Sequence, residues 1–231
     1  MTINTTPVVA AFDLDGTLSN GGSVLKWLRD VAGTWPTYLA TLRLAGPIFV
    51  GALRSGPWAD RAKERLFQRL LGGRDAIEVA DTSKRFAVAH FKSHGRQRLL
   101  ERLTWHLRQG HDVVIVSASP QIYVDIVAQE LGAAAGLGTR LAVDPRGALT
   151  GSYLGKNCRG EEKMRRLSEW IEARHYAGAP LVYAYGNSRG DRAMLRAAGR
   201  PYNVGRLGRL GTLGHFPRLN SETTAPITAG E

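Results

Sequence analysis

The chain has 231 residues, of which 43% are hydrophobic and 22% are charged. This balance excludes an intrinsically disordered protein and provides for a substantial core, in one domain or in a domain with an insert. The net charge of +11 favours acidic partners, such as phosphate esters, anionic lipid surfaces or nucleic acid, without choosing among them. The single cysteine, Cys158, excludes an intramolecular disulfide and a cysteine-based zinc site.

The N-terminal region predicts a buried strand. Residues 1–7 are polar, and the apolar run over residues 8–12 is too short for the hydrophobic region of a signal peptide, so we expect a cytoplasmic protein. Residues 7–12 are apolar and partly β-branched, which is typical of a strand buried on both faces of a parallel sheet. The strand ends at Asp13.

Two carboxylates, Asp13 and Asp15, follow this strand. In an extended chain, residues two apart point to the same side, and Gly16 allows a sharp turn without a side chain in the way. One interpretation is a site of phosphoryl transfer, in which Asp13 attacks phosphorus and Asp15 is the general acid and base. The alternative is a solvated turn that only closes the strand.

Residues 21–94 carry amphipathic helical patterns without a buried strand, and we interpret them as a helical cap inserted after the first strand. Within the cap, residues 35–53 are about as long as a membrane span but contain Arg43 and Pro47. This segment has three interpretations: a transmembrane helix, a helix at the surface of an anionic membrane, and an apolar helix packed on its neighbours.

The second predicted strand covers residues 112–119, between helical patterns over residues 96–109 and 121–131. It ends with Ser117 and Ala118 at the start of a helix. The Ser117 hydroxyl and the Ala118 backbone amide suit the binding of phosphoryl oxygens there. The alternative role for Ser117 is that of a helix cap.

A hairpin is predicted over residues 141–153, because two short apolar pieces flank an Asp-Pro-Arg-Gly turn. A helix follows over residues 160–174, with Lys163 near its start. In that position an ammonium group could neutralise both a phosphate and the Asp13 carboxylate. The alternative is a solvated surface charge.

The third predicted strand, residues 180–187, ends at Asn187, and Asp191 opens a helix over residues 191–198. The side-chain oxygens of Asn187 and Asp191 suit a hard cation such as Mg²⁺, although a turn followed by a helix cap would use the same residue types. Strands and helices alternate, which predicts an α/β fold with a doubly wound parallel sheet. Ligands bind such sheets beyond the carboxyl ends of the strands, so we expect the three polar strand ends to converge.

In this order, the polar residues at the three strand ends, together with Lys163, resemble the four motifs of the haloacid dehalogenase superfamily, in its phosphoserine-phosphatase-like branch with a helical cap (subfamily IB). The resemblance covers residues 8–205. Three local strings also resemble the phosphatidylglycerophosphatase C-like subgroup, and they lie at residues 105–111, 116–120 and 154–163.

The resemblance implies a Mg²⁺-dependent phosphatase that acts in two steps. The residue matching Asp13 forms an aspartyl-phosphate, and the one matching Asp15 protonates the leaving group and then activates water. Asp13, the Asp15 backbone carbonyl and Asn187 would hold Mg²⁺. The family more often has Asp in place of Asn187, so one negative charge is absent and the metal is held more weakly. Asp191 would supply the remaining carboxylate, directly or through water.

The expected organisation is an α/β core and a helical cap, followed by a flexible tail; the core takes residues 1–20 and 95–218, the cap 21–94 and the tail 219–231. The expected substrate is a phosphate ester that is small or lipid-linked: phosphoserine-like, histidinol-phosphate-like or phosphatidylglycerophosphate-like. A lipid-linked substrate would bring peripheral contact with the anionic inner face of the membrane. The alternatives are a phosphotransferase to an alcohol and a non-catalytic protein that binds phosphate or an anionic surface. Nucleic acid is not expected, because no binding motif is recognised.

Overall fold

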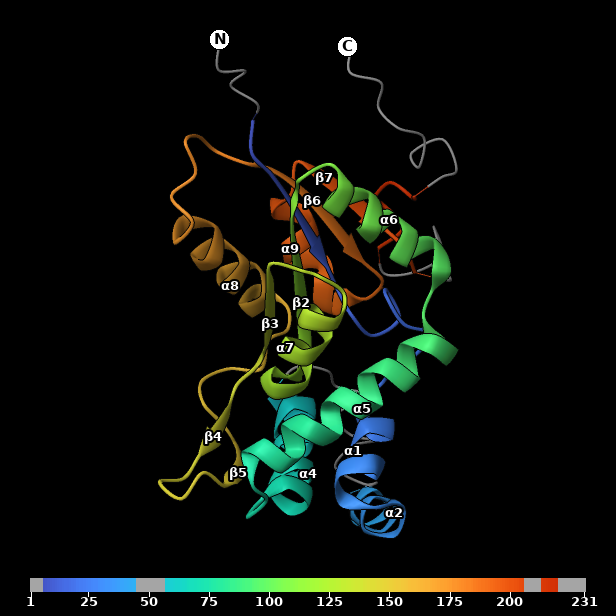
Figure 1. Cartoon of the computed structure of the whole chain (residues 1–231), viewed down its shortest axis with the longest axis vertical. Helices are drawn as coiled ribbons and strands as arrows, with labels where there is room; N and C mark the ends of the chain where they lie inside the picture. Colours follow the sequence, from blue (N-terminus) through green and yellow to red (C-terminus); the bar gives the residue numbers. More distant parts are fainter. Residues whose placement is uncertain (1–5, 45–56, 206–212, 220–231) are drawn as a thin grey trace.

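The fold is built on a five-stranded parallel sheet in the order β3-β2-β1-β6-β7 (Figure 1). The computed structural model describes residues 6–44, 57–205 and 213–219. The strands are β1 (Val8–Phe12), β2 (Asp112–Pro120), β3 (Ala135–Thr139), β6 (Leu181–Gly186) and β7 (Arg200–Asn203). The three central strands are the apolar runs expected from the sequence, and the predicted doubly wound α/β class is confirmed.

Helices cover both faces of this sheet. Successive side chains of a strand point to opposite faces, so apolar strands need a cover on each side. Ala10 and Phe12 of β1 point to one face, under α6 (Gln97–Arg108) and α7 (Gln121–Glu130). Val9 and Ala11 point to the other face, under α8 (Glu161–Glu172) and α9 (Arg192–Ala197), which follows the short 3-10 helix η1 (Arg189–Asp191). The central strand is therefore buried on both sides, and the polar residues that follow it in the chain lie beyond its carboxyl end.

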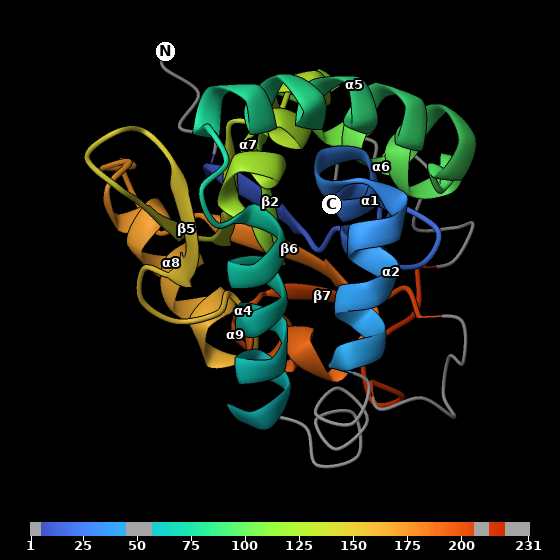
Figure 2. The ribbon, with the colours of Figure 1, turned by 90° about the horizontal axis from the view of Figure 1, so that it is seen from below.

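The segment between β1 and α6 forms a helical layer beyond the carboxyl ends of the strands (Figures 1 and 2). Its described helices are α1 (Val24–Ala32), α2 (Thr34–Arg43), α4 (Pro57–Leu71) and α5 (Ala76–His94). Trp27, Phe67 and Phe86 from this layer are buried in the same apolar cluster as Phe12 of the sheet. The layer is thus packed firmly against the sheet edge where ligands are expected.

A hairpin of β4 (Leu141–Val143) and β5 (Leu149–Tyr153) extends from the core, as the turn pattern predicted. The sequence assigned it to the core, but it packs against α4 of the helical layer. A Cβ atom at Gly151 would lie 2.4 Å from Gln68 Cα, so the two backbones approach closely at that point. The Glu64 carboxylate also accepts a hydrogen bond from the Tyr153 backbone N–H.

The sequence did not predict the edge strands β3 and β7, and a physical reason explains each omission. β3 contains Gly136 and Gly138, residues that weaken a strand pattern. They are needed because a Cβ atom at either position would lie within 3 Å of the backbone of α7. β7 begins Arg200-Pro201, and proline is tolerated in a sheet at an edge strand, where β7 lies.

Three sequence features fall wholly or partly outside the described residues. They are residues 45–53 of the apolar cap segment, residues 206–212 of the predicted core, and the predicted tail from residue 220 onward. Within the described part of the chain, no helix has the length and apolar character needed to cross a bilayer.

Candidate active site

Asp13 lies at the centre of a buried polar cluster at the carboxyl end of β1. β1 pairs in register with β2 and β6, so the chain positions just after Phe12 lie beside Ser117 and Gly186 on the neighbouring strands. The Thr17 hydroxyl donates a hydrogen bond to Asp13 Oδ2 at 2.9 Å, and Lys163 Nζ donates to Asp13 Oδ1 at 2.5 Å. Both carboxylate oxygens are therefore held in fixed directions.

Lys163 joins two carboxylates, that of Asp13 just after β1 and that of Asp191 in η1. Its side chain is 2% exposed and lies in the first turn of α8, with Asp13 Oδ1 at 2.5 Å and Asp191 Oδ1 at 2.6 Å from Nζ. Burial alone would lower the pKa of Lys163, but Asp13 and Asp191 outweigh burial and raise it. Lys163 is therefore a permanent cation beside Asp13, which agrees with the expectation from the sequence and not with a solvated surface charge.

The Asp191 carboxylate is used twice within the protein. Its Oδ1 accepts from Lys163, and its Oδ2 accepts from the backbone N–H groups of Asn187 and Ser188 and from the Ser188 hydroxyl, at 2.9–3.1 Å. A Cβ atom at Gly186 would lie 2.5 Å from Asp191 Cβ, so glycine is required for this approach. These contacts fix Lys163 and the Asn187 loop. That Asp191 supplies a carboxylate for Mg²⁺, directly or through water, stays a prediction.

Asn187 lies against the turn that follows Asp13. Its Nδ2 donates to the Asp15 backbone carbonyl at 3.1 Å, while its buried Oδ1 has no hydrogen-bond partner. Gly16 makes this contact possible, because its φ is +83° and a Cβ atom there would lie only 1.8 Å from Asn187 Nδ2. The glycine after Asp15 thus serves the approach of Asn187 as well as the turn.

A magnesium ion fits this donor set. The unpartnered oxygen of Asn187, the carbonyl of Asp15 and the carboxylate of Asp13 are hard oxygen ligands of the kind Mg²⁺ prefers. Rotation of the Asn187 amide by a half-turn would direct Oδ1 instead of Nδ2 toward the Asp15 carbonyl, an arrangement that only a shared cation makes favourable. No group of three or more His, Cys, Asp or Glu side chains in the described residues forms a metal site, so any ion here depends on these mixed ligands.

The environment of Asp13 also favours a cation. Burial, with the nearby Asp191 charge, raises the pKa of Asp13 to about 7, and Lys163 only partly opposes this shift. A carboxylate in such surroundings gains from an added positive charge, because the charge offsets the lost hydration. Nucleophile and metal ligand are therefore compatible roles for this one side chain.

The Asp15 carboxylate is held between the core and the helical layer. Its Oδ1 accepts from the Ser23 backbone N–H at 2.6 Å, just before α1, and its Oδ2 accepts from the Ser119 hydroxyl at 2.8 Å. Asp13 and Asp15 thus point to different partners: Asp13 to Lys163 and Asp15 to the helical layer. A division into nucleophile and general acid needs this kind of separation.

Ser117 and Ala118 lie within the last four residues of β2, near this cluster, and the helix that follows begins at Gln121. The Ser117 hydroxyl oxygen accepts from the Ser119 backbone N–H at 3.1 Å, which leaves its hydrogen available for an anion. The Ala118 carbonyl accepts from Thr139 at 2.9 Å and from Lys63 at 2.6 Å.

Lys63 is a residue whose position at the site could not be found from the sequence. It comes from α4 of the helical layer, and its pKa is lowered to about 8 by burial, with Asp15 and Asp60 opposing the shift. Lys63 and Lys163 thus place two ammonium groups around Asp13 and Asp15. No local pattern distinguishes Lys63 from the other basic residues of α4, because only tertiary packing brings it to β2.

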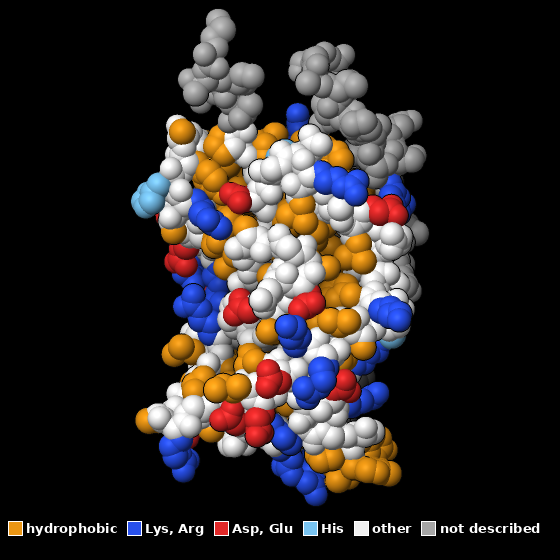
Figure 3. Space-filling view, in the orientation of Figure 1, with side chains coloured by type: hydrophobic (Ala, Val, Ile, Leu, Met, Phe, Trp, Pro, Cys, Tyr) orange, Lys and Arg blue, Asp and Glu red, His pale blue; other side chains and the backbone are white. Residues whose placement is uncertain are grey.

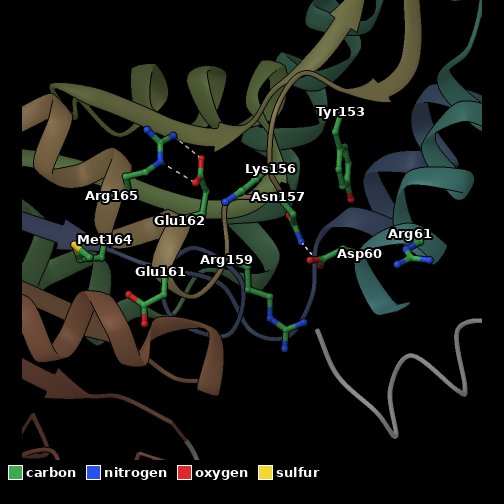
Figure 4. A pocket seen from close by; sticks show the side chains of 10 residues that line it. All are labelled: Asp60, Arg61, Tyr153, Lys156, Asn157, Arg159, Glu161, Glu162, Met164 and Arg165. Atoms are coloured by element: carbon green, nitrogen blue, oxygen red, sulfur yellow. Dashed lines mark hydrogen bonds and ion pairs between the residues drawn. The ribbon is translucent and has the colours of Figure 1, made fainter. Parts of the chain in front are cut away.

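A cleft of about 580 Å³ opens beside α4, between the helical layer and the core (Figure 4). Asn157 Nδ2 donates to Asp60 Oδ1 at 2.6 Å across it, and Thr139 connects Asn157 to the Ala118 carbonyl. A chain of hydrogen bonds therefore leads from the cleft wall to the end of β2. Arg159 lines the cleft and also lies against Gly190, next to the Asp191 loop.

Solved structures share the overall fold of this chain. A protein of unknown function from Bordetella pertussis Tohama I superposes with a TM-score of 0.73 at 23% identity, covering 86% of this chain and 90% of the other. A phosphoserine phosphatase, solved as an analogue of its phospho-aspartyl intermediate, superposes with a TM-score of 0.60 at 20% identity, covering 86% and 87% of the two chains.

Sequence relatives cover most of the chain. The protein CicA of Caulobacter vibrioides (strain NA1000 / CB15N) is 32% identical over 193 residues, 83% of each chain. A histidinol-phosphatase of Neisseria meningitidis serogroup C is 26% identical over 211 residues, 85% of this chain and 89% of its own. The family model for haloacid dehalogenase-like hydrolases matches residues 10–196, which include every candidate site residue. The superfamily predicted from the four motifs is confirmed: the chain belongs to the haloacid dehalogenase-like hydrolases.

Proposed function

We propose that this hydrolase is a Mg²⁺-dependent phosphomonoesterase that works through an aspartyl-phosphate on Asp13. The observation that carries the proposal is the pairing of Asp13 with the buried Lys163, while Asp15 is held apart by Ser23 and Ser119. A nucleophilic carboxylate needs a neighbouring cation to receive a phosphate dianion, and a separate carboxyl group to protonate the alcohol that leaves.

In the proposed reaction each residue has one role. The Asp13 carboxylate attacks phosphorus, Lys163 neutralises the phosphoryl oxygens, and the Ser117 hydroxyl and Ala118 N–H bind them. Asp15 donates a proton to the leaving oxygen and then removes one from the water that hydrolyses the intermediate. When bound by Asp13, the Asp15 carbonyl and Asn187, Mg²⁺ supplies further positive charge to the phosphoryl group. Asp191 orients Lys163 and the Asn187 loop.

The relatives support a small phosphate ester as substrate. One sequence relative is a histidinol-phosphatase and one structural neighbour is a phosphoserine phosphatase. In the proposed organisation, α1, α2, α4 and α5 form the cap that closes over the sheet edge, with Lys63 beside the leaving group.

The test is a screen of phosphate esters with and without Mg²⁺, with release of inorganic phosphate as the readout. Serine phosphate, histidinol phosphate, glycerol phosphate and phosphatidylglycerophosphate cover the candidate classes. Removal of the metal by a chelator should abolish release, and its replacement should restore it. Absence of metal-dependent release from every ester would overturn the proposal. Added glycerol that becomes phosphorylated in place of phosphate release would identify a phosphotransferase.

A lipid-linked substrate is the second candidate, and an exposed apolar face of the helical layer favours it. Trp35 of α2 is 73% exposed and Trp58 of α4 is 53% exposed, and further exposed apolar side chains on α2 are Tyr38, Leu39 and Leu42. The face is visible at the lower end of the molecule (Figure 3). Arg61 lies over the Trp58 ring at 5.1 Å. Aromatic side chains with neighbouring arginines are typical of contact with an anionic membrane.

Co-sedimentation with vesicles tests this candidate. Vesicles rich in phosphatidylglycerol should bind the protein at low salt, and neutral phosphatidylcholine vesicles should not. Trp35→Ser combined with Leu42→Ser should weaken binding. Ile77→Ser is the matched control: Ile77 is as exposed as Trp35 (74%), but it lies on α5, so its replacement should not weaken binding. No binding to anionic vesicles, or equal binding by both variants, rejects the membrane contact and leaves a small soluble ester.

A further inference from the structure

The hydrogen bonds of Asp15 reveal a second serine that the roles above leave unused. Ser119 is 1% exposed, lies two residues after Ser117 in β2, and donates its hydroxyl to Asp15 Oδ2 at 2.8 Å. The Ser119 backbone N–H in turn donates to Ser117 Oγ at 3.1 Å. One short segment thus connects the phosphate-binding serine with the carboxyl group that faces the leaving oxygen.

The two donors on Asp15 differ chemically. The Ser23 backbone N–H can only donate, so it holds Oδ1 as an acceptor. The Ser119 hydroxyl donates to one lone pair of Oδ2, which leaves the other lone pair of that oxygen for the proton that is transferred. The carboxyl group is therefore pinned through Oδ1, while Oδ2 remains the oxygen that can give and take a proton without losing its partner.

We propose that Ser119 is a positioning residue for the general acid: it fixes the Asp15 carboxyl group so that Oδ2 delivers the proton to the leaving oxygen. The inference rests on the proposed phosphatase function. In the first step the Asp13 oxygen–phosphorus bond forms, the ester oxygen–phosphorus bond breaks, and the proton on Oδ2 moves to the departing oxygen. In the second step Oδ2 takes a proton from water as the water oxygen bonds to phosphorus and the Asp13 bond breaks.

The surroundings of Oδ2 support this direction. Ser119 follows Ala118, whose carbonyl accepts a hydrogen bond from Lys63, and Lys63 is close enough to Asp15 for the carboxylate to affect its pKa. Oδ2 therefore faces the side of the phosphate site where the helical layer meets the core. Lys163 contacts Asp13 and Asn187 contacts the Asp15 carbonyl, so neither of them binds Oδ2.

Leaving-group dependence tests the role of Ser119. The leaving oxygen of an alkyl phosphate needs a proton. That of an aryl phosphate such as 4-nitrophenyl phosphate needs one far less, because nitrophenolate leaves as an anion. Ser119→Ala should lower kcat/KM for glycerol phosphate by about 10- to 100-fold, a part of the roughly 10²- to 10⁴-fold that general acid catalysis contributes, and for 4-nitrophenyl phosphate by less than about threefold. Ser119→Thr should restore much of the loss, since it keeps the hydroxyl.

A double-mutant cycle separates positioning from a merely structural effect. In the Asp15→Asn background, Ser119→Ala should cause no further loss on glycerol phosphate, because the group that it positions is gone. Equal losses on both substrates, or full additivity with Asp15→Asn, would overturn the inference. If Ser119→Ala does not fold, Ser119→Cys serves the same comparison. Failure of the proposed function is a distinct result, since it would appear as no Mg²⁺-dependent activity of the unmodified protein on either ester.

Discussion

The carboxyl edge of the sheet buries charged side chains, whereas the outer face of the helical layer exposes apolar ones. At the edge, Asp13, Lys163 and Asp191 are charged and almost completely buried, and each is held by short hydrogen bonds. On the outer face, Trp35 and Trp58 are large and apolar and lie in solvent. The edge is fixed by strand register and by glycines that permit close approach, so single atoms there should matter. Any contact made by the outer face would depend on how many apolar side chains it exposes, so each substitution there should have a partial effect.

Gly16 should show the largest effect of a small change at the edge. In Gly16→Ala the new methyl group would lie 1.8 Å from Asn187 Nδ2, at a φ of +83°. The Asn187 loop must shift, and we expect kcat to fall at least about 100-fold, as for a misplaced catalytic group.

Gly147→Ala is the matched control for Gly16→Ala. Gly147 has a φ of +84° with no atom near its added Cβ, so this variant should lose about 1 kcal/mol of stability and keep its activity. Phosphate release and thermal unfolding measure both variants. Normal activity in Gly16→Ala would show that the Asn187 contact is not needed.

Asn187→Asp should strengthen the metal site while weakening the metal-free protein. A carboxylate adds charge for Mg²⁺, so the Mg²⁺ concentration for half activity should fall by roughly tenfold. Without metal, the new charge would face the Asp15 carbonyl, which now accepts from Asn187 Nδ2. Titration of activity with Mg²⁺, and unfolding in a chelator, give the two readouts. An unchanged Mg²⁺ requirement would remove Asn187 from the ligand set.

The pH dependence of Mg²⁺ activation should reflect Asp13. Its pKa of about 7 in the metal-free protein is raised by burial and by Asp191, so a proton competes with the metal below that pH. The Mg²⁺ requirement should rise about tenfold for each unit below pH 7 and level off above it. The measurement is a titration of activity with Mg²⁺, repeated at about seven pH values between about pH 5.5 and about pH 8.5. A requirement that stays constant across the range contradicts Asp13 as a ligand.

Acid stability should show a smaller effect away from the site. His106 is buried, and its pKa is lowered to about 2 by burial and by the nearby Arg102 and His111. The unfolded chain takes up a proton near pH 6.5, but the folded chain does not until about pH 2. Stability is therefore full above pH 6.5 and falls below it by about 1.4 kcal/mol per unit.

A glutamine at position 106 provides the comparison. His106→Gln should flatten the acid-side loss, whereas His175→Gln should not, because His175 is exposed. Urea unfolding at a series of pH values measures the slope. An unchanged slope in His106→Gln would mean that another group takes up the proton.

Most of the candidate site's arrangement could be predicted from the sequence, because parallel strands that end in polar residues bring those residues to one edge. Asp13, Ser117 and Asn187 were found in this way, and Lys163 by its place at a helix start. Lys63 and the bond from Ser119 to Asp15 could not be predicted, because they depend on how α4 and β2 meet. The two edge strands were missed because glycine and proline weaken their patterns while serving close packing.

The central claim is that Asp13 is the covalent nucleophile. The direct measurement is the mass of the intact protein and of its proteolytic peptides after a rapid acid quench during turnover of 4-nitrophenyl phosphate with Mg²⁺. The unmodified protein should gain the mass of one phosphoryl group on the peptide that contains Asp13, and Asp13→Asn should gain none and release no phosphate. Metal-dependent phosphate release by Asp13→Asn, or an adduct on another residue, would contradict the account.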